Sequence, residues 1–342
     1  MTGPVTGSVN RSAGSALTGR RIAIALAVVA LIAVPYAITE TYYVNIASQI
    51  LLYAIFAIGL NVLVGYAGLV SLGHAGLFGI AAYAVAYLLA AGYGHAFAII
   101  AGLAIGLLAT AGFAALALRA AGISFIMITL ALGEIIWGVA YRWISLTNGD
   151  NGISVASRPE PFGFSLASAR SFYDATLLVF LLAVVAVAIF VRSPLGAALC
   201  GMRDQPRRMT ALGYHVWMTR FWAFMLSGLL TSVAGILFVY YNQFISPQAL
   251  ALTASAEGLL MVISGGAGTL LGPIVGAALV VIVKNVVSAY VTRWNFMLGA
   301  IFVAIVVFMP EGLVPGAVRL VRTALKAGSR GKTQASLAVT KQ

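Results

Sequence analysis

The sequence is poor in charge, in acidic residues and in cysteine. Only 8% of its 342 residues are Asp, Glu, Lys or Arg, whereas soluble domains average about a quarter. Its eight acidic residues and three histidines are too sparse for a paired-carboxylate or metal site, and its single cysteine excludes an internal disulfide. The motifs GxxxxGK[ST], HExxH and CxxC do not occur. We therefore expect no catalysis, no P-loop for ATP, and no resident cofactor or metal in this chain.

Apolar sequence is what the chain has in abundance. Hydrophobic residues make up 62% of it, and the mean hydropathy is +1.03. The apolar runs predict an all-α polytopic integral membrane protein with about eight to ten transmembrane helices, because one crossing needs roughly 20 apolar residues. The predicted crossings are 22–38, 46–64, 69–91, 97–118, 123–144, 176–191, 221–241, 259–283 and 296–309.

Basic residues are clustered, and the net charge is +12. Lys/Arg clusters beside spans mark the cytoplasmic side of a membrane protein. This predicts a cytoplasmic N-terminal tail at 1–21, a transmembrane domain at 22–313 and a basic cytoplasmic tail at 314–342. The Arg-rich loop 192–220 is then cytoplasmic, and the polar loop 147–173 lies on the opposite side. Contact with the membrane surface explains the basic charge better than nucleic acid does.

Glycine interrupts two of the apolar runs. Asn61–Gly79 contains five glycines, and Gly265–Gly276 contains five glycines and one proline. A glycine costs about 1 kcal/mol against alanine in a helix interior, and freed backbone groups are tolerated in a membrane only where protein or an aqueous cavity surrounds them. Both stretches therefore predict broken or re-entrant helices with a transport path between them. A broken second stretch also returns the basic tail to the cytoplasm.

Polar and small residues near these breaks are the candidates for the path. A carboxylate is costly inside an apolar run, so Glu134 could either hold a substrate ammonium group or serve the structure. Ser71, His74 and Thr129 could contact substrate or satisfy freed backbone groups. Glu257 is better explained as a helix cap or a partner of an arginine. The candidate path residues are Gly65, Gly68, Ser71, His74, Thr129, Glu134, Gly265, Gly266 and Gly268.

The loop 192–220 contains a second kind of signal. Residues 195–213 are predicted to form one short basic helix that ends at Gly213, a typical helix C-terminal residue. Such a helix could lie on anionic lipid, or it could be the lever through which a soluble motor moves the spans. The residues alone favour the lipid.

Several short motifs resemble those of one transporter family. They run from Tyr42 to Leu313 and comprise Asn61–Gly68, Ser71–Gly76, Thr129–Ala131, Gly133, Glu134, Asn148–Ile153, Arg203, Asp204, Ala211–Gly213, Ser246, Pro247, Glu257, Met261, Gly265–Thr269, Gly272, Pro273 and Pro310–Leu313. The pattern resembles the LivM-type members of the LivH/LivM permease family. These are membrane subunits of bacterial ABC importers for branched-chain amino acids.

The resemblance implies partners and sites in the bacterial inner membrane. A second, LivH-like permease, two ABC ATPases that carry ATP and magnesium, and a periplasmic substrate-binding protein would complete the importer. Residues 195–213 would then be a coupling helix. The resemblance therefore favours a helix moved by a soluble motor over a helix that lies on anionic lipid. The residues implied at the ATPase are Arg203, Asp204, Arg207, Arg208 and Gly213, and those on the binding-protein side are Asn148, Asp150 and Asn151. Family members usually carry an acidic Arg-Glu-Asn-Glu-like run in this loop, where this chain has RDQPRR. The difference implies that the partner ATPase is more acidic at this point.

Two other functions are compatible with the sequence. The same family includes importers of urea and short-chain amides, and no residue separates those substrates from leucine. A free-standing channel could also be built from paired half-helices. The sequence has no Asn-Pro-Ala motif, however, and a channel gives the loop 192–220 no task.

Overall fold

The computed structural model describes residues 29–33, 35–36, 40–155, 158–159, 166–290, 294–309, 311–317 and 319. The predicted tail 1–21, most of the first predicted crossing 22–38, and the basic tail beyond residue 319 lie outside the described residues. Residues 156–157 and 160–165 of the loop 147–173, and Pro310, lie outside them as well.

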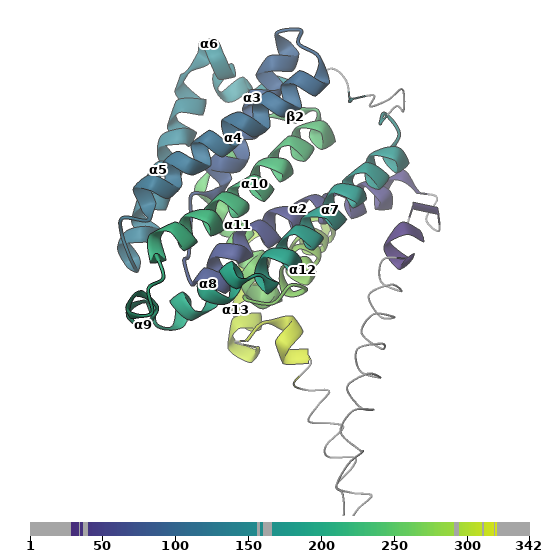
Figure 1. The fold of residues 1–342 in the computed structure, drawn as a ribbon. Coiled ribbons are helices and arrows are strands. Elements are labelled where there is room, and N and C mark those ends of the chain that lie inside the picture. Colours follow the sequence, from purple (N-terminus) through teal and green to yellow (C-terminus); the bar gives the residue numbers. More distant parts are fainter. Residues whose placement is uncertain are drawn as a thin grey trace, which may run out of the picture.

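The described part of the chain is almost entirely helical (Figure 1). The longer helices are α2 (Thr41–Asn61), α4 (His95–Ala117), α5 (Ile123–Arg142), α7 (Ala169–Arg192) and α10 (Val216–Asn242). The shorter ones are α3 (His74–Ala90), α6 (Ile144–Thr147), α8 (Pro194–Asp204), α9 (Pro206–Ala211), α11 (Leu252–Gly265), α12 (Gly272–Tyr290) and α13 (Trp294–Phe308). Further elements are the π-helix η1 (Val62–Ala67), the 3-10 turns η2 (Gly149–Asn151) and η4 (Pro247–Leu250), and the strands β1 (Ile153–Ser154) and β2 (Phe244–Ile245).

Five of these helices are long and apolar enough to cross a membrane. They are α2 with η1, α4, α5, α7 and α10, and the apolar helices α3, α11 and α12 are shorter. Apolar side chains that would be buried in a soluble protein lie exposed on α4 and α7, among them Ile100, Leu108, Leu182 and Ile189. The predicted fold class, an all-α polytopic membrane protein, is confirmed.

Helix α2 forms the centre of the fold. It packs against α7, α10, α11 and α12, and most of its side chains are buried. A helix that is hydrophobic all round belongs in such a position. By contrast, α4, α5 and α7 bury one side and leave the other side apolar and exposed, as expected where lipid or another apolar surface covers them.

Small residues let the helices around α2 approach closely. A Cβ atom added at Gly235 of α10 would lie 2.1 Å from the carbonyl oxygen of Phe78 on α3. One added at Gly106 of α4 would lie 2.4 Å from the hydroxyl of Ser232 on α10. Close backbone contact through glycine is the usual way in which membrane helices gain packing energy. The position of α3, and of the break before it, therefore depends on these glycines.

Two differences from the predicted boundaries have a clear local cause. Residues 195–213 form two helices, α8 and α9, and not one. The break lies at Gln205, whose φ of −146° and ψ of 84° are non-helical, because a following proline disfavours helical backbone in the residue before it. Helix α7 begins at Ala169 and not at 176, since the Ser168 hydroxyl accepts the Ser171 N–H at 3.1 Å and caps a polar first turn.

Candidate functional site

Both predicted helix breaks are present. Helix α2 widens into η1 and ends at Gly68, whose φ of +68° is left-handed, and α3 starts at His74. Helix α11 ends at Gly265, and the chain turns through Gly266 and Gly268, with φ of +118° and +80°, before α12. Left-handed backbone strongly favours glycine, which explains why clustered glycines marked these breaks in the sequence.

The two breaks lie side by side. The Asn61 side chain, at the end of α2, donates from Nδ2 to the carbonyl of Thr269 and accepts the N–H of Gly268, both at 2.9 Å. A Cβ atom at Gly65 would lie 2.2 Å from the Gly268 nitrogen. One buried amide thus satisfies backbone groups that the second break frees. The second break can approach the first this closely only because residue 65 is glycine.

His74 belongs to a buried chain of hydrogen bonds. Its Nδ1 lies 2.8 Å from the Ser71 hydroxyl, its Nε2 lies 2.9 Å from the Ser227 hydroxyl, and Ser227 donates to the carbonyl of Gly59 at 2.6 Å. Because the Ser227 proton is used on Gly59, its oxygen accepts from Nε2–H, and Nδ1 accepts from Ser71. Both ring nitrogens are thus used inside the fold, which favours the structural role of the two considered for His74.

Helix α5 packs on the extended link between η1 and α3. The Leu72 N–H donates to the Thr129 hydroxyl at 3.3 Å, and that hydroxyl donates to the carbonyl of Ile126 at 2.9 Å. A Cβ atom at Gly133 would lie 3.1 Å from the Cα of Gly73. Glu134 is half-buried, and within the described ranges it makes no hydrogen bond or ion pair.

Arg203, on α8, bonds to the first break and lies close to the second. Its guanidinium Nη1 donates to the carbonyl of Gly65, and the same atom would lie 3.3 Å from a Cβ atom at Gly268. A Cβ atom at Gly68 would lie 2.9 Å from the Arg203 Cγ. The side chain therefore touches the first break and lies against the second.

All the residues implied at the ATPase, Arg203 included, are exposed. Asp204, Arg207 and Arg208 all face outward on α8 and α9. Gly213 has a φ of +88°, and the N–H of Tyr214 after it donates to the carbonyl of Met209 at 3.1 Å. This bonding pattern closes a helix C-terminus, so the predicted helix end at Gly213 is confirmed.

The opposite end of the molecule carries the NGDNG motif (Figure 1). Asn148 has a left-handed φ of +60°, and its Nδ2 donates to the carbonyl of Gly152 at 2.9 Å. The side chains of Asn148, Asp150 and Asn151 are exposed. Directly after them, β1 pairs antiparallel with β2, with Ile153 opposite Ile245. The motif is thereby fixed to the segment that follows α10.

Arg158 anchors the same loop a few residues later. Its Nε donates to the carbonyl of Tyr240 at 3.1 Å, and its guanidinium lies 4.6 Å from the centre of the Phe172 ring. Burial lowers the pKa of this guanidinium from its ordinary value. The loop is therefore tied to α10 and α7 at the end where Asn148, Asp150 and Asn151 are exposed.

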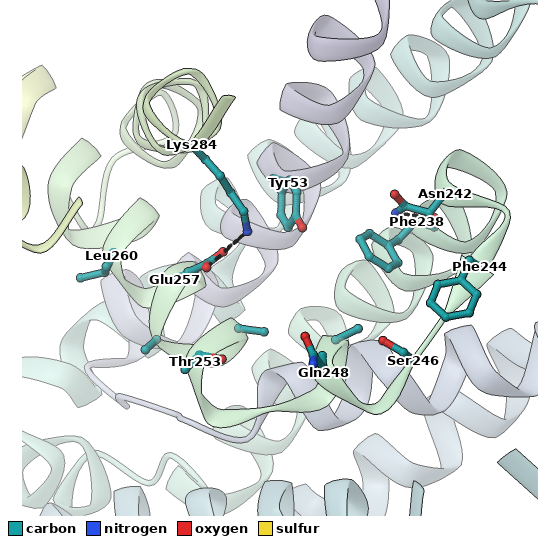
Figure 2. A pocket seen from close by; sticks show the side chains of 13 residues that line it. Tyr53, Phe238, Asn242, Phe244, Ser246, Gln248, Thr253, Glu257, Leu260 and Lys284 are labelled. Carbon is teal, nitrogen blue, oxygen red and sulfur yellow. Dashed lines mark hydrogen bonds and ion pairs between the residues drawn. The ribbon is translucent and has the colours of Figure 1, made fainter. Parts of the chain in front are cut away.

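A cavity of about 740 Å³ lies between α2, α10, α11 and α12 (Figure 2). The Lys284 ammonium group reaches from α12 to the Glu257 carboxylate on α11, with 3.2 Å between Nζ and Oε2. Tyr53 lies beside this ion pair, and Phe238 and Phe244 form the facing wall. Other polar lining residues are Asn242, Ser246, Gln248 and Thr253.

A smaller cavity of about 40 Å³ shares part of this lining and extends it inward. It reaches Ala75 and Phe78 on α3, just after the first break, and it is also lined by Tyr53 and Glu257. The space between the helices therefore leads from the connection after α10 toward the break that precedes α3.

The main cavity includes residues that the sequence reasoning missed or misjudged. Glu257 lies one turn inside α11 and pairs with a lysine, so its predicted roles as a helix cap and as an arginine partner are wrong. Lys284 was missed, although a lysine in an apolar run is itself a functional signal. Of the candidate path residues, none lines this cavity, and Gly65, Gly68 and Gly268 lie against Arg203 instead.

Broken helices, a polar cavity between them and an apolar exterior define a multi-pass membrane permease. The chain belongs to the family described as branched-chain amino acid transport system / permease component, whose model matches residues 42–306. The resemblance found in the sequence is confirmed. As a member of a permease family, the chain is a transport subunit and not itself an enzyme.

Individual relatives agree with this family. The high-affinity branched-chain amino acid transport system permease protein LivM of Escherichia coli is 32% identical over 326 residues, which cover 88% of this chain and 76% of the relative. The LivM protein of Salmonella typhimurium is 30% identical over the same shares. The LivH permease of Escherichia coli is 24% identical over 77% of this chain and 91% of its own length. No solved structure is a significant match.

Proposed function

We propose that this chain is the LivM-type permease subunit of an ABC importer that carries branched-chain amino acids across the bacterial inner membrane. The family and the names of its relatives support the substrate class. The observation that carries the mechanism is the position of Arg203, which links α8 to both helix breaks. A channel that opens without a motor has no use for such a link.

The partners follow from the two ends of the molecule. A LivH-like permease pairs with this chain, and two ABC ATPases, which hold ATP and magnesium, dock on α8 and α9 at the cytoplasmic side. The exposed Arg207 and Arg208 suit an acidic groove on the ATPase. A periplasmic binding protein docks at Asn148, Asp150 and Asn151. Both termini of the chain are cytoplasmic, as the basic tails indicate.

In this mechanism the motor moves the breaks. Closure of the ATPases around ATP displaces α8 and α9, and Arg203 transmits the displacement to the carbonyl of Gly65 and to the turn at Gly268. Because Asn61 bonds the two breaks to each other, they move together. The spans alternate between outward and inward access, which requires that the ATP-bound motor stabilise one of the two states more than the other.

Affinity purification tests the assembly. A C-terminal tag on the chain, mild detergent and native expression should recover two P-loop ATPases and a second, similar permease, identified by mass spectrometry. Recovery of the chain alone, or only with itself, would overturn the importer proposal and favour a channel. The reconstituted complex with its binding protein should then take up labelled leucine in competition with isoleucine and valine, but not with urea. ATP-driven uptake of urea without leucine would overturn the substrate class.

A further inference from the structure

We propose that the cavity between α2, α10, α11 and α12 is an amino-acid binding site of the permease itself. In it, the Glu257 carboxylate binds the substrate ammonium group, the Lys284 ammonium group binds the substrate carboxylate, and Tyr53, Phe238 and Phe244 contact the aliphatic side chain. This inference rests on the proposed function and gives it a site within this chain.

The depth of the cavity places it on a transport path. Tyr53 and Glu257 each lie about two helical turns before a break, at Asn61 and Gly265 respectively. The end of the cavity at Tyr53 and Glu257 therefore lies within the length of the helices, away from α8 and α9, and the cavity opens at the exposed Phe244 and Gln248. Its rim includes Phe244 of β2, the strand that pairs with β1 after the NGDNG motif. Substrate released at that face would meet this cavity first.

The charges in the cavity match a zwitterion. Glu257 and Lys284 have opposite signs, and their side chains keep 20% and 34% of their surface exposed. Without a ligand, each neutralises the other. When a free amino acid enters, each exchanges its partner for the opposite charge on the ligand, so that no net charge is added to the interior. Urea carries neither charge and offers nothing in exchange for separating the pair.

The rest of the lining suits a branched aliphatic amino acid. Phe238 and Phe244 face the ion pair across the cavity, and Tyr53 lies beside the ion pair (Figure 2). Leu260 also lines the cavity. Ligand sites typically combine such apolar walls with a few placed polar groups in about 300–1,000 Å³, and this cavity measures about 740 Å³. The ion pair thus determines orientation, and the aromatic wall favours an apolar side chain.

The packing of α11 against α12 does not require the ion pair. Helices α11 and α12 are already in backbone contact, because a Cβ atom at Gly276 would lie 1.8 Å from the carbonyl oxygen of Met261. The Asn285 side chain, one residue after Lys284, donates to Gln49 of α2 at 3.0 Å and fixes this part of α12. Intramembrane ionisable groups are expensive and usually functional, so a pair that opens into a cavity points to a ligand.

Equilibrium dialysis on the purified complex with all its partner subunits in nanodiscs, without the binding protein, tests this site. The probes are labelled leucine, 4-methylpentanoate, which lacks the ammonium group, and 3-methylbutylamine, which lacks the carboxylate. The wild-type complex should bind leucine at least about tenfold more tightly than either analogue, as expected for one charged hydrogen bond.

The two single variants should give opposite patterns. Glu257→Gln should abolish the preference for leucine over 4-methylpentanoate and keep the preference over 3-methylbutylamine. Lys284→Gln should do the reverse. The double variant Glu257→Gln/Lys284→Gln retains an uncharged hydrogen-bonding pair and should bind all three probes about equally weakly. Asp174→Asn, the same change of a carboxylate to an amide on the exposed side of α7, should match the wild type.

Other results would overturn the site. Equal weakening of all three probes in each single variant would show a purely structural ion pair. Unchanged binding in the variants would show that the site lies elsewhere, and a wild type without saturable leucine binding would have no such site. If a single variant fails to assemble, the double variant replaces it, and a retained preference for leucine over the analogues in the double variant would overturn the site. Normal leucine uptake by the wild-type importer together with any of these results would remove the site and leave the proposed function intact.

Discussion

The side chain of Asn61 bonds to the backbone at Gly268, 207 residues further along the chain, and so joins the two interrupted helices. It accepts the Gly268 N–H and donates to the carbonyl of Thr269, both at 2.9 Å. Neither backbone group belongs to a helix. A single side chain thus replaces the backbone hydrogen bonds that the α11–α12 turn loses where it leaves helical geometry. The same side chain fixes that turn against η1.

Replacing Asn61 should therefore destabilise the turn. Asn61→Ala leaves one half-buried donor and one half-buried acceptor unpaired, and an unpaired group costs up to about 1–3 kcal/mol when it is fully buried. The apparent melting temperature of the complex in detergent should fall by several degrees, and leucine uptake should fall with it. Ser48→Ala is the control. It removes the hydrogen bond from the Ser48 hydroxyl to the carbonyl of Val44, and that carbonyl still lies within α2. Equal melting temperatures for both variants would contradict the joining role of Asn61.

Arg203 should be required for coupling and not for assembly. Arg203→Gln or Arg203→Glu removes the contact with the carbonyl of Gly65, so ATP hydrolysis should continue while leucine uptake falls more than about tenfold, the effect of losing a charged hydrogen bond. The measurement is uptake per ATP hydrolysed in proteoliposomes. Arg119→Gln, an exposed arginine between α4 and α5, should keep the wild-type ratio. Normal uptake by both Arg203 variants would count against the coupling assignment.

Glycine at 65 should be a steric requirement. A Cβ atom there would lie 2.2 Å from both the Gly268 nitrogen and the Asn61 Oδ1, so Gly65→Ala must separate the two breaks. We expect loss of the monodisperse complex on size-exclusion chromatography or a complex without uptake. Gly112→Ala on α4 meets nothing within 4 Å and should gain about 1 kcal/mol of helix propensity. Equal behaviour of the two variants would show that the breaks separate freely.

His74 should act on stability and not on substrate affinity. His74→Ala leaves Ser227 and Ser71 without their shared partner, so the melting temperature should fall by several degrees while the concentration of leucine at half-maximal uptake changes less than about twofold. The double variant His74→Ala/Ser227→Ala should be less destabilised than the sum of the single variants, because contacting residues are not additive. A large change in leucine affinity would instead place His74 on the path.

Much of the membrane architecture could be predicted because its causes are local. Low charge and long apolar runs predict a polytopic helical protein whatever its packing. Clustered glycines predict breaks because they lower helix propensity and permit left-handed backbone at positions such as Gly68 and Gly266. Pro206 also predicts that the helix over 195–213 is divided, because a proline disfavours helical backbone in the residue before it. The prediction of one helix did not take this signal into account.

The membrane class, the family and the positions of both helix breaks could be predicted from the sequence, since composition, motifs and backbone preference act over a few residues. Which residues contact one another depends on how the helices pack. Asn61 with Gly268, Arg203 with Gly65, and Glu257 with Lys284 are pairs from distant segments. No local pattern determines such pairs, because they depend on how close packing at glycine orients one helix against the next.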